Sequence, residues 1–275
     1  MVRAWMVAVS VSLAFVAGCQ TVDTTKSGVV GVDRDQRMMV SAEEVNAGAA
    51  KAYSQMMAEA QKKGVLDRDP AMVKRVQEIT KRLIPHTVAF RDDAGKWPWE
   101  VHVITTDEVN AWCMPAGKMA MYTGLIQKLN ATDDEIAAVM GHEISHALRE
   151  HSREQISRQM STQLGIGVVG ALLGIGDMGQ SIAGQVANVT LNLPNSRNAE
   201  VEADRIGIEL AARAGYDPSA AVSLWQKMSK LGGGQPPKWL STHPSHEDRI
   251  ADLKVYSEKV MPLYTAAKGS AAAGK

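Results

Sequence analysis

The feature that most constrains this chain is a pair of histidines four residues apart, His142 and His146, with Glu143 directly after the first. The segment around them starts at Asp133 and places apolar residues at helical spacing, so we expect a helix. Residues four apart share one helix face, and both imidazoles can therefore reach one metal ion. Glu143 can reach a metal-activated water without binding the metal. The sequence thus predicts a hydrolytic zinc site.

A catalytic zinc needs a third protein ligand. One known pattern breaks the helix at a glycine and supplies a third histidine ten residues after the first, but Arg149 and Ser152 stand at those positions. His151 is one residue out of register and is interpreted either as a surface residue or as a contact of a ligand. The remaining option is a glutamate on a later helix. Glu200 fits, and Asp204 one turn on can accept the free N–H of a ligating imidazole.

The remaining sequence is typical of an α+β protein that is mostly helical. Helical spacing, caps and stop signals predict helices at 41–63, 70–85, 133 to beyond 151, 198–214, 218–230 and 245–258. Alternating or short apolar runs predict strands at 99–104, 111–114 and 118–122, the last two joined by a turn. We expect a small antiparallel sheet beside the active-site helix. The run at 118–122 is interpreted as a sheet edge that can bind a peptide as an added strand.

The first residues have the pattern of an export signal. An apolar run over 4–17 is too short and too early for a membrane span, and small residues then lead to Cys19. We expect residues 1–18 to be a lipoprotein signal peptide and Cys19 to be lipidated. The alternative is an ordinary signal peptide with an incidental cysteine. Gln20 favours the outer membrane, with the protein facing the periplasm.

Composition then divides the rest of the chain. Residues 19–40 are polar and aperiodic and predict a lipid-anchored flexible tether. Residues 41–262 are expected to form the domain that carries the zinc site, a metallopeptidase domain, and 263–275 are a small-residue tail expected to be disordered. The glycine-rich apolar segment 165–184 is interpreted as a lid over the cleft, with membrane contact as the alternative. The formal net charge is zero, which gives no reason to expect nucleic acid as a partner.

Three motifs occur in a fixed order along the chain. They are Gly141–Ala147 around the histidines, Ser196-Arg197 leading into Glu200 and Asp204, and Ser241-Thr242-His243-Pro244-Ser245 with Arg249. In this combination the chain resembles the type-I CAAX-protease family of zinc metallopeptidases, and most of all its soluble bacterial envelope lipoprotein branch. Residues 110–118 are similar to the strand before the active helix in that branch. The resemblance covers roughly residues 43–256 and implies a gluzincin-type domain.

The resemblance also implies roles. It implies one zinc per chain, bound by His142, His146 and Glu200, with Glu143 as the general base. It further implies envelope quality control, with unfolded or misassembled envelope proteins as substrates. A rival interpretation is a zinc-stabilised lipoprotein that acts mainly as a chaperone or assembly partner. His243 is expected near the zinc, where it either stabilises the oxyanion or occupies the open position and holds the enzyme latent.

Two arginines and a further histidine complete the set of candidates. Arg249 is expected to pair with a carboxylate near the site or to form a structural ion pair, and the same alternatives hold for Arg197. His246 is expected at the surface.

Overall fold

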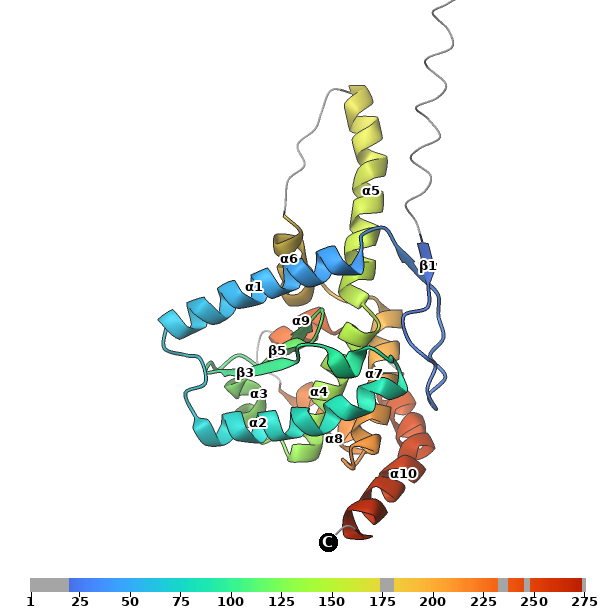
Figure 1. The fold of residues 1–275 in the computed structure, drawn as a ribbon. Helices are drawn as coiled ribbons and strands as arrows, with labels where there is room; N and C mark the ends of the chain where they lie inside the picture. Colours follow the sequence, from blue (N-terminus) through green and yellow to red (C-terminus); the bar gives the residue numbers. More distant parts are fainter. Residues whose placement is uncertain (1–19, 174–180, 232–236, 245–247, 274–275) are drawn as a thin grey trace, which may run out of the picture.

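The expected class, α+β and mostly helical, is confirmed by a computed structural model that describes residues 20–173, 181–231, 237–244 and 248–273, without the side chains of 163–173 and 270–273 (Figure 1). In chain order the elements are β1 (Gln20–Val22), β2 (Gln36–Met38), α1 (Ala42–Lys62), α2 (Pro70–Leu83), the 3-10 helices η1 (Ile84–Ala89) and η2 (Ala94–Lys96), β3 (Glu100–Ile104), β4 (Ala111–Met114), β5 (Lys118–Tyr122), α3 (Thr123–Lys128), α4 (Asp133–Leu148), α5 (His151–Leu173), α6 (Ile182–Asn192), α7 (Arg197–Arg213), α8 (Ala220–Lys230), α9 (Lys238–Thr242) and α10 (Arg249–Ala273).

Helix α4 is the centre of the molecule. It starts with a capping box, in which the Thr132 hydroxyl accepts the Glu135 N–H and the Glu135 carboxylate accepts the Thr132 N–H. Burial acts to raise the pKa of Glu135, but Lys227 at 2.6 Å and a hydrogen bond from Ser223 lower it overall. Every residue from Glu135 to Leu148 is buried. The histidine motif therefore lies on a core helix, away from solvent.

The three-stranded sheet is mixed, and the prediction of an antiparallel sheet is only partly right. β4 and β5 form an antiparallel hairpin, whereas β3 pairs with β5 in parallel. The hairpin turn has positive φ at Ala116 (59°) and Gly117 (78°), as tight hairpins require. Because the strand order is β3-β5-β4, β5 is the central strand and the predicted sheet edge at 118–122 is wrong. The edge nearest α4 and α6 is β4.

Helices α4 and α7 touch backbone to backbone at two glycines. A Cβ on Gly141 would be 2.7 Å from the Gly207 carbonyl oxygen, and a Cβ on Gly207 would be 2.7 Å from the His142 nitrogen. Real Cβ atoms do not come that close, so the crossing requires glycine on both helices. This approach brings the first turns of α7, which carry Glu200, next to the histidines of α4.

Residues 20–40, which we call the N-terminal arm, are packed against the domain and are not the flexible tether that was predicted. β1 and β2 pair in antiparallel fashion, and Val30 and Gln36 are fully buried. The Gln36 amide donates to the Arg149 carbonyl, and the Val30 N–H donates to the Glu209 carboxylate. The arm stays ordered because its polar groups have partners on the domain, which composition alone does not reveal.

Two further expectations on helix ends are wrong. α10 continues to Ala273, so residues 263–273 are helical and not disordered. The helix with the histidines does not run past His151, because α4 ends at Leu148, Glu150 takes a positive φ of 50°, and α5 starts at His151. α5 then extends away from the rest of the molecule (Figure 1).

Some predictions fall on parts that the structure does not describe. Cys19 and the signal peptide lie outside the described residues, as do residues 174–180 in the middle of the predicted lid. The flanking parts of that segment form the end of α5 and the start of α6. None of the described helices combines the length and apolarity that crossing a membrane requires.

Candidate metal centre

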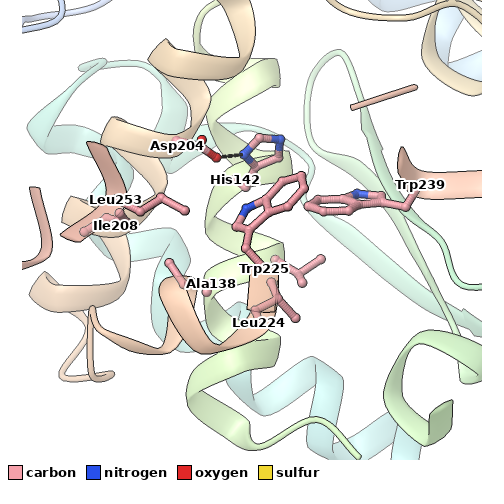
Figure 2. A pocket seen from close by; sticks show the side chains of 10 residues that line it. Ala138, His142, Asp204, Ile208, Leu224, Trp225, Trp239 and Leu253 are labelled. Atoms are coloured by element: carbon pink, nitrogen blue, oxygen red, sulfur yellow. Dashed lines mark hydrogen bonds and ion pairs between the residues drawn. The ribbon is translucent and has the colours of Figure 1, made fainter. Parts of the chain in front are cut away.

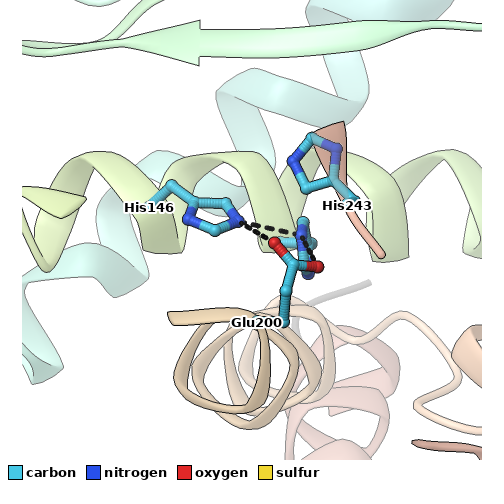
Figure 3. A group of neighbouring side chains, drawn as sticks. His146, Glu200 and His243 are labelled. Atoms are coloured by element: carbon cyan, nitrogen blue, oxygen red, sulfur yellow. Dashed lines mark hydrogen bonds and ion pairs between the residues drawn. The ribbon is translucent and has the colours of Figure 1, made fainter. Parts of the chain in front are cut away.

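Four buried side chains from three parts of the chain meet at one point. They are His142 and His146 from α4, Glu200 from α7 and His243 at the end of α9, and their potential ligand atoms all lie within 4.8 Å of one another. Figure 3 shows His146 and Glu200 facing each other across the gap between α4 and α7, with His243 close by. The structure thus brings together the three predicted ligands and His243, the histidine that was predicted to lie near them.

The hydrogen bonds of His142 fix which of its nitrogens faces the cluster. Its Nδ1 is 2.9 Å from the Asp204 carboxylate, which can only accept, so Nδ1 carries the proton and Nε2 keeps its lone pair (Figure 2). Arg249 donates to the same Asp204 oxygen at 2.7 Å. Burial lowers the pKa of His142, which favours the neutral ring that a metal binds. Asp204 has the position predicted for it.

His146 is held in a similar way by a neighbour that the sequence left ambiguous. Its Nδ1 is 2.8 Å from Nδ1 of His151, and Nε2 of His151 is 3.0 Å from the Glu202 carboxylate. His151 is only 3% exposed, so of its two interpretations the contact with a ligand is the one observed. Burial lowers the pKa of His151 to about 4. Burial acts to raise the pKa of Glu202, but the hydrogen bonds that it accepts from His151 and Arg34 lower this pKa to about 2.

The cluster fits a zinc ion by chemistry and by distance. Both carboxylate oxygens of Glu200 are buried and accept no hydrogen bond within the described residues, although Arg249 Nη1 is 2.8 Å from Oε2. The two histidine Nε2 atoms are 3.0 Å apart, and His146 Nε2 is 3.4 Å from Glu200 Oε1. Two zinc–nitrogen bonds of about 2.0–2.1 Å at a tetrahedral angle separate their nitrogens by about 3.3 Å. A bound cation would satisfy these carboxylate oxygens, which accept no hydrogen bond, together with the converging imidazole lone pairs.

Glu143 lies beside this cluster and is engaged by α9. Trp239 donates its indole N–H to Glu143 Oε1 at 2.8 Å, and His243 Nε2 is 3.4 Å from the same oxygen. The His243 Nδ1 is 3.1 Å from the Trp239 carbonyl, so Nδ1 carries the proton and the Nε2 lone pair faces the site. Burial lowers the pKa of His243 to about 4. One short helix therefore contacts the candidate base and also places a third imidazole, that of His243, at the cluster.

Comparison with known proteins agrees with this arrangement. Residues 70–257 match the profile of Peptidase family M48. The chain belongs to peptidase family M48. The matched range contains all four residues of the cluster together with Glu143. The predicted metallopeptidase is thereby confirmed at the level of the family, and the assignment to a CAAX-protease branch stays a prediction.

Relatives of this M48 chain include both mitochondrial and bacterial proteins. It is 39% identical over 166 residues to the mitochondrial metalloendopeptidase OMA1 of Arabidopsis thaliana, covering 59% of the chain and 33% of that protein. It is 32% identical over 208 residues to OMA1 of Schizosaccharomyces pombe, covering 75% of the chain and 59% of that protein. It is 30% identical over 210 residues to the beta-barrel assembly-enhancing protease of Escherichia coli, covering 72% of the chain and 41% of that protein. The chain thus spans from a third to three fifths of the length of these relatives.

The other predicted residues have clear positions. Arg249 is fully buried and joins Glu200 to Asp204, so of its two interpretations the one near the site is observed. Arg197 makes an exposed ion pair with Asp248, 3.2 Å away, and does not reach the site. His246 lies outside the described residues.

Three residues of the site were not singled out from the sequence: Trp239, Glu202 and Arg149. Trp239 stands four residues before His243, one helical turn away, which is a usable signal once α9 is known. Glu202 lies midway between Glu200 and Asp204, and no motif in the sequence marks it. Arg149 is fully buried against Glu202, at 2.9 Å, and no local pattern in the sequence predicts that contact.

Proposed function

We propose that this chain is a zinc-dependent endopeptidase with His142, His146 and Glu200 as metal ligands and Glu143 as general base. The observation that carries the proposal is the cluster of two imidazole lone pairs and two carboxylate oxygens that accept no hydrogen bond, all in one buried place. Zinc bound there would supply a Lewis acid that activates water and polarises the peptide carbonyl. The proposed stoichiometry is one zinc per chain.

Other residues of the chain would orient the metal ligands and transfer the proton. Asp204 and His151 hold the two ligating imidazoles in the tautomers that leave Nε2 free. Glu143 takes a proton from the attacking water at its carboxylate and passes it to the leaving amine. Trp239 keeps one oxygen of that carboxylate in a fixed direction.

A substrate peptide is proposed to add to the sheet along β4. This strand is at the sheet edge and packs against α4, which carries the site, whereas β5 is bonded on both sides. Pairing with an edge strand uses main-chain hydrogen bonds, so it tolerates many side chains. That recognition suits unfolded segments, and we propose unfolded or misassembled envelope proteins as substrates. An E. coli relative is named a beta-barrel assembly-enhancing protease, which supports an envelope role.

The proposal for the location of the protein rests on the N-terminal sequence. We propose that the chain is an outer-membrane lipoprotein, acylated at Cys19 and facing the periplasm, because small residues and a cysteine follow the apolar run at the expected distance. The relatives include mitochondrial and bacterial proteins, so this proposal rests on the N-terminal sequence of the chain itself.

We further propose that His243 holds the enzyme latent. Its Nε2 faces the ligand cluster, and α9 engages Glu143 at the same time through Trp239. A neutral imidazole there would compete with water for the open metal position. His243→Ala is then expected to raise basal cleavage of an unfolded substrate without loss of zinc. A drop in turnover on the order of a hundredfold would instead indicate an oxyanion-stabilising role.

The main test compares the wild type with Glu143→Ala and His146→Ala by zinc content and casein cleavage. Glu143→Ala is expected to retain its zinc and lose cleavage, because it removes the base and no ligand. His146→Ala is expected to lose both. Equal loss of zinc from the two variants would contradict the assigned roles. A chaperone role would instead leave Glu143→Ala fully able to suppress aggregation of an unfolded client and to replace the wild type in cells.

A further inference from the structure

A chain of buried polar contacts runs from the ligand His146 out to the N-terminal arm. His146 Nδ1 meets His151 Nδ1 at 2.8 Å, and His151 Nε2 meets Glu202 Oε2 at 3.0 Å. Glu202 is then bound by Arg149 Nε at 2.9 Å and by the guanidinium of Arg34 from the arm. These contacts link a metal-ligating position on α4 to residues of α5, α7 and the arm.

The donors and acceptors in this chain allow one consistent direction. A carboxylate only accepts, so the proton of His151 is on Nε2, facing Glu202. The neutral ring then has its lone pair on Nδ1, which accepts the Nδ1–H of His146. His146 is left with its lone pair on Nε2, the atom that faces Glu200 and His142. Each link thus sets the state that a ligating imidazole needs.

The break between α4 and α5 is what makes the contact possible. Five residues of continuous helix turn by about 500°, so His151 would point roughly 140° away from His146. The positive φ of Glu150 redirects the chain and places the two rings 4.9 Å apart, centroid to centroid. Arg91 and Arg153 both pair with the Glu150 side chain and hold this turn.

The arm completes the network from the other side. Arg34 binds Glu202 and is also bidentate to Glu154 of α5, at 2.6 and 2.9 Å. Arg149 is fully buried and donates to the Arg34 carbonyl at 2.6 Å as well as to Glu202. Glu202 therefore has its carboxylate clamped between a residue of the arm and a residue at the helix break.

We propose that His151 and Glu202 are positioning residues for the metal ligand His146, and that the N-terminal arm, through Arg34, is part of the metal site's support. This inference rests on the proposed zinc function. It predicts that metal affinity depends on residues that never touch the metal and on a segment at the start of the described chain. Losing such a partner of a ligating histidine typically weakens metal affinity by about 10–100-fold.

The test measures the zinc Kd by chelator competition and the visible spectrum of the cobalt-substituted protein, neither of which depends on peptidase activity. His151→Leu keeps the volume and removes the acceptor, and it should raise the Kd by about 10–100-fold and change the cobalt spectrum. His151→Asn places an amide oxygen near the position of Nδ1 as an acceptor, so its zinc affinity should fall less than that of His151→Leu. Arg34→Met should raise the Kd by a smaller factor than His151→Leu, because Arg149 still binds Glu202.

Arg75→Met is the matched control for Arg34→Met, because Arg75 is about as exposed as Arg34 and also pairs with a carboxylate, Asp133 at 2.6 Å, without contacting His151 or Glu202. It should bind zinc like the wild type. A His151→Leu protein with wild-type Kd and spectrum would overturn the inference, as would an equal loss in Arg75→Met, which would indicate a general loss of stability. Unchanged binding in Arg34→Met alone would overturn the role of the arm. A wild type that binds no zinc would overturn the proposed function itself.

Discussion

Replacing Gly207 by alanine probes the contact on which the site geometry depends. The new Cβ would lie 2.7 Å from the His142 nitrogen and 2.9 Å from the Gly141 carbonyl carbon, both backbone atoms that cannot rotate away. Ordinary contact begins near 3.4 Å, so α4 and α7 must separate by several tenths of an ångström. Overpacking of this kind costs about 1–3 kcal/mol. Alanine regains only about 0.5–1 kcal/mol over glycine in a helix, so the net effect is destabilising.

Chemical denaturation of the metal-free protein measures this balance. Gly207→Ala should lower the free energy of unfolding by roughly 1–2 kcal/mol and weaken zinc binding, because Glu200 moves with α7. Gly269→Ala is the control, since that glycine lies in α10 with no atom within 4 Å of the added Cβ, and it should be neutral or stabilising. A Gly207→Ala protein as stable as the wild type, with the same zinc affinity, would refute the argument that backbone contact fixes the ligands.

Three more predictions concern charge and the anchor. The pKa of Glu135 is lowered in the folded state, so the carboxylate stabilises the fold above its unfolded pKa, and this stabilisation is lost as the pH falls through the folded pKa. In urea unfolding from about pH 6 to pH 3, the free energy of unfolding should therefore depend less steeply on pH for Glu135→Gln than for the wild type. Arg249→Met leaves Glu200 and Asp204 without their buried cation, which should cost about 3–5 kcal/mol in the metal-free protein and less with zinc bound; equal losses in both states by thermal melting would contradict this. Cys19→Ser should abolish N-terminal acylation. The predicted lipid anchor would be contradicted if the variant partitioned into detergent like the wild type and the wild-type N-terminus carried no acyl mass.

Local chemistry explains why the ligands were predictable. A helical spacing of four fixes His142 and His146 on one face whatever the rest of the fold does. The same rule relates Glu200 to Asp204 on α7. Helix starts at residues 41 and 133 were also predicted from local sequence, and in the structure both helices begin there with capping boxes, at Ser41 and Thr132. Short-range geometry of this kind survives any tertiary arrangement.

Long-range contacts explain the errors. The N-terminal arm is polar and was predicted to be flexible, yet it is ordered by partners more than a hundred residues away, such as Arg149 for Gln36. Which strand lies at the sheet edge is decided by how the hairpin docks on β3, and the strand sequences do not encode it. His151 could not be assigned because its direction depends on the positive φ of Glu150, which a residue other than glycine rarely adopts.

The ordered arm also changes what an acyl group on Cys19 would do. A flexible tether of 21 residues could reach about 70 Å when extended, and the domain would sample a wide shell above the membrane. In the folded chain β1 begins at Gln20, the residue directly after Cys19. In an acylated protein almost no flexible chain would therefore separate the folded domain from the bilayer. Its active site would then act only within reach of the domain itself, so a substrate would have to come to the membrane surface to be cleaved.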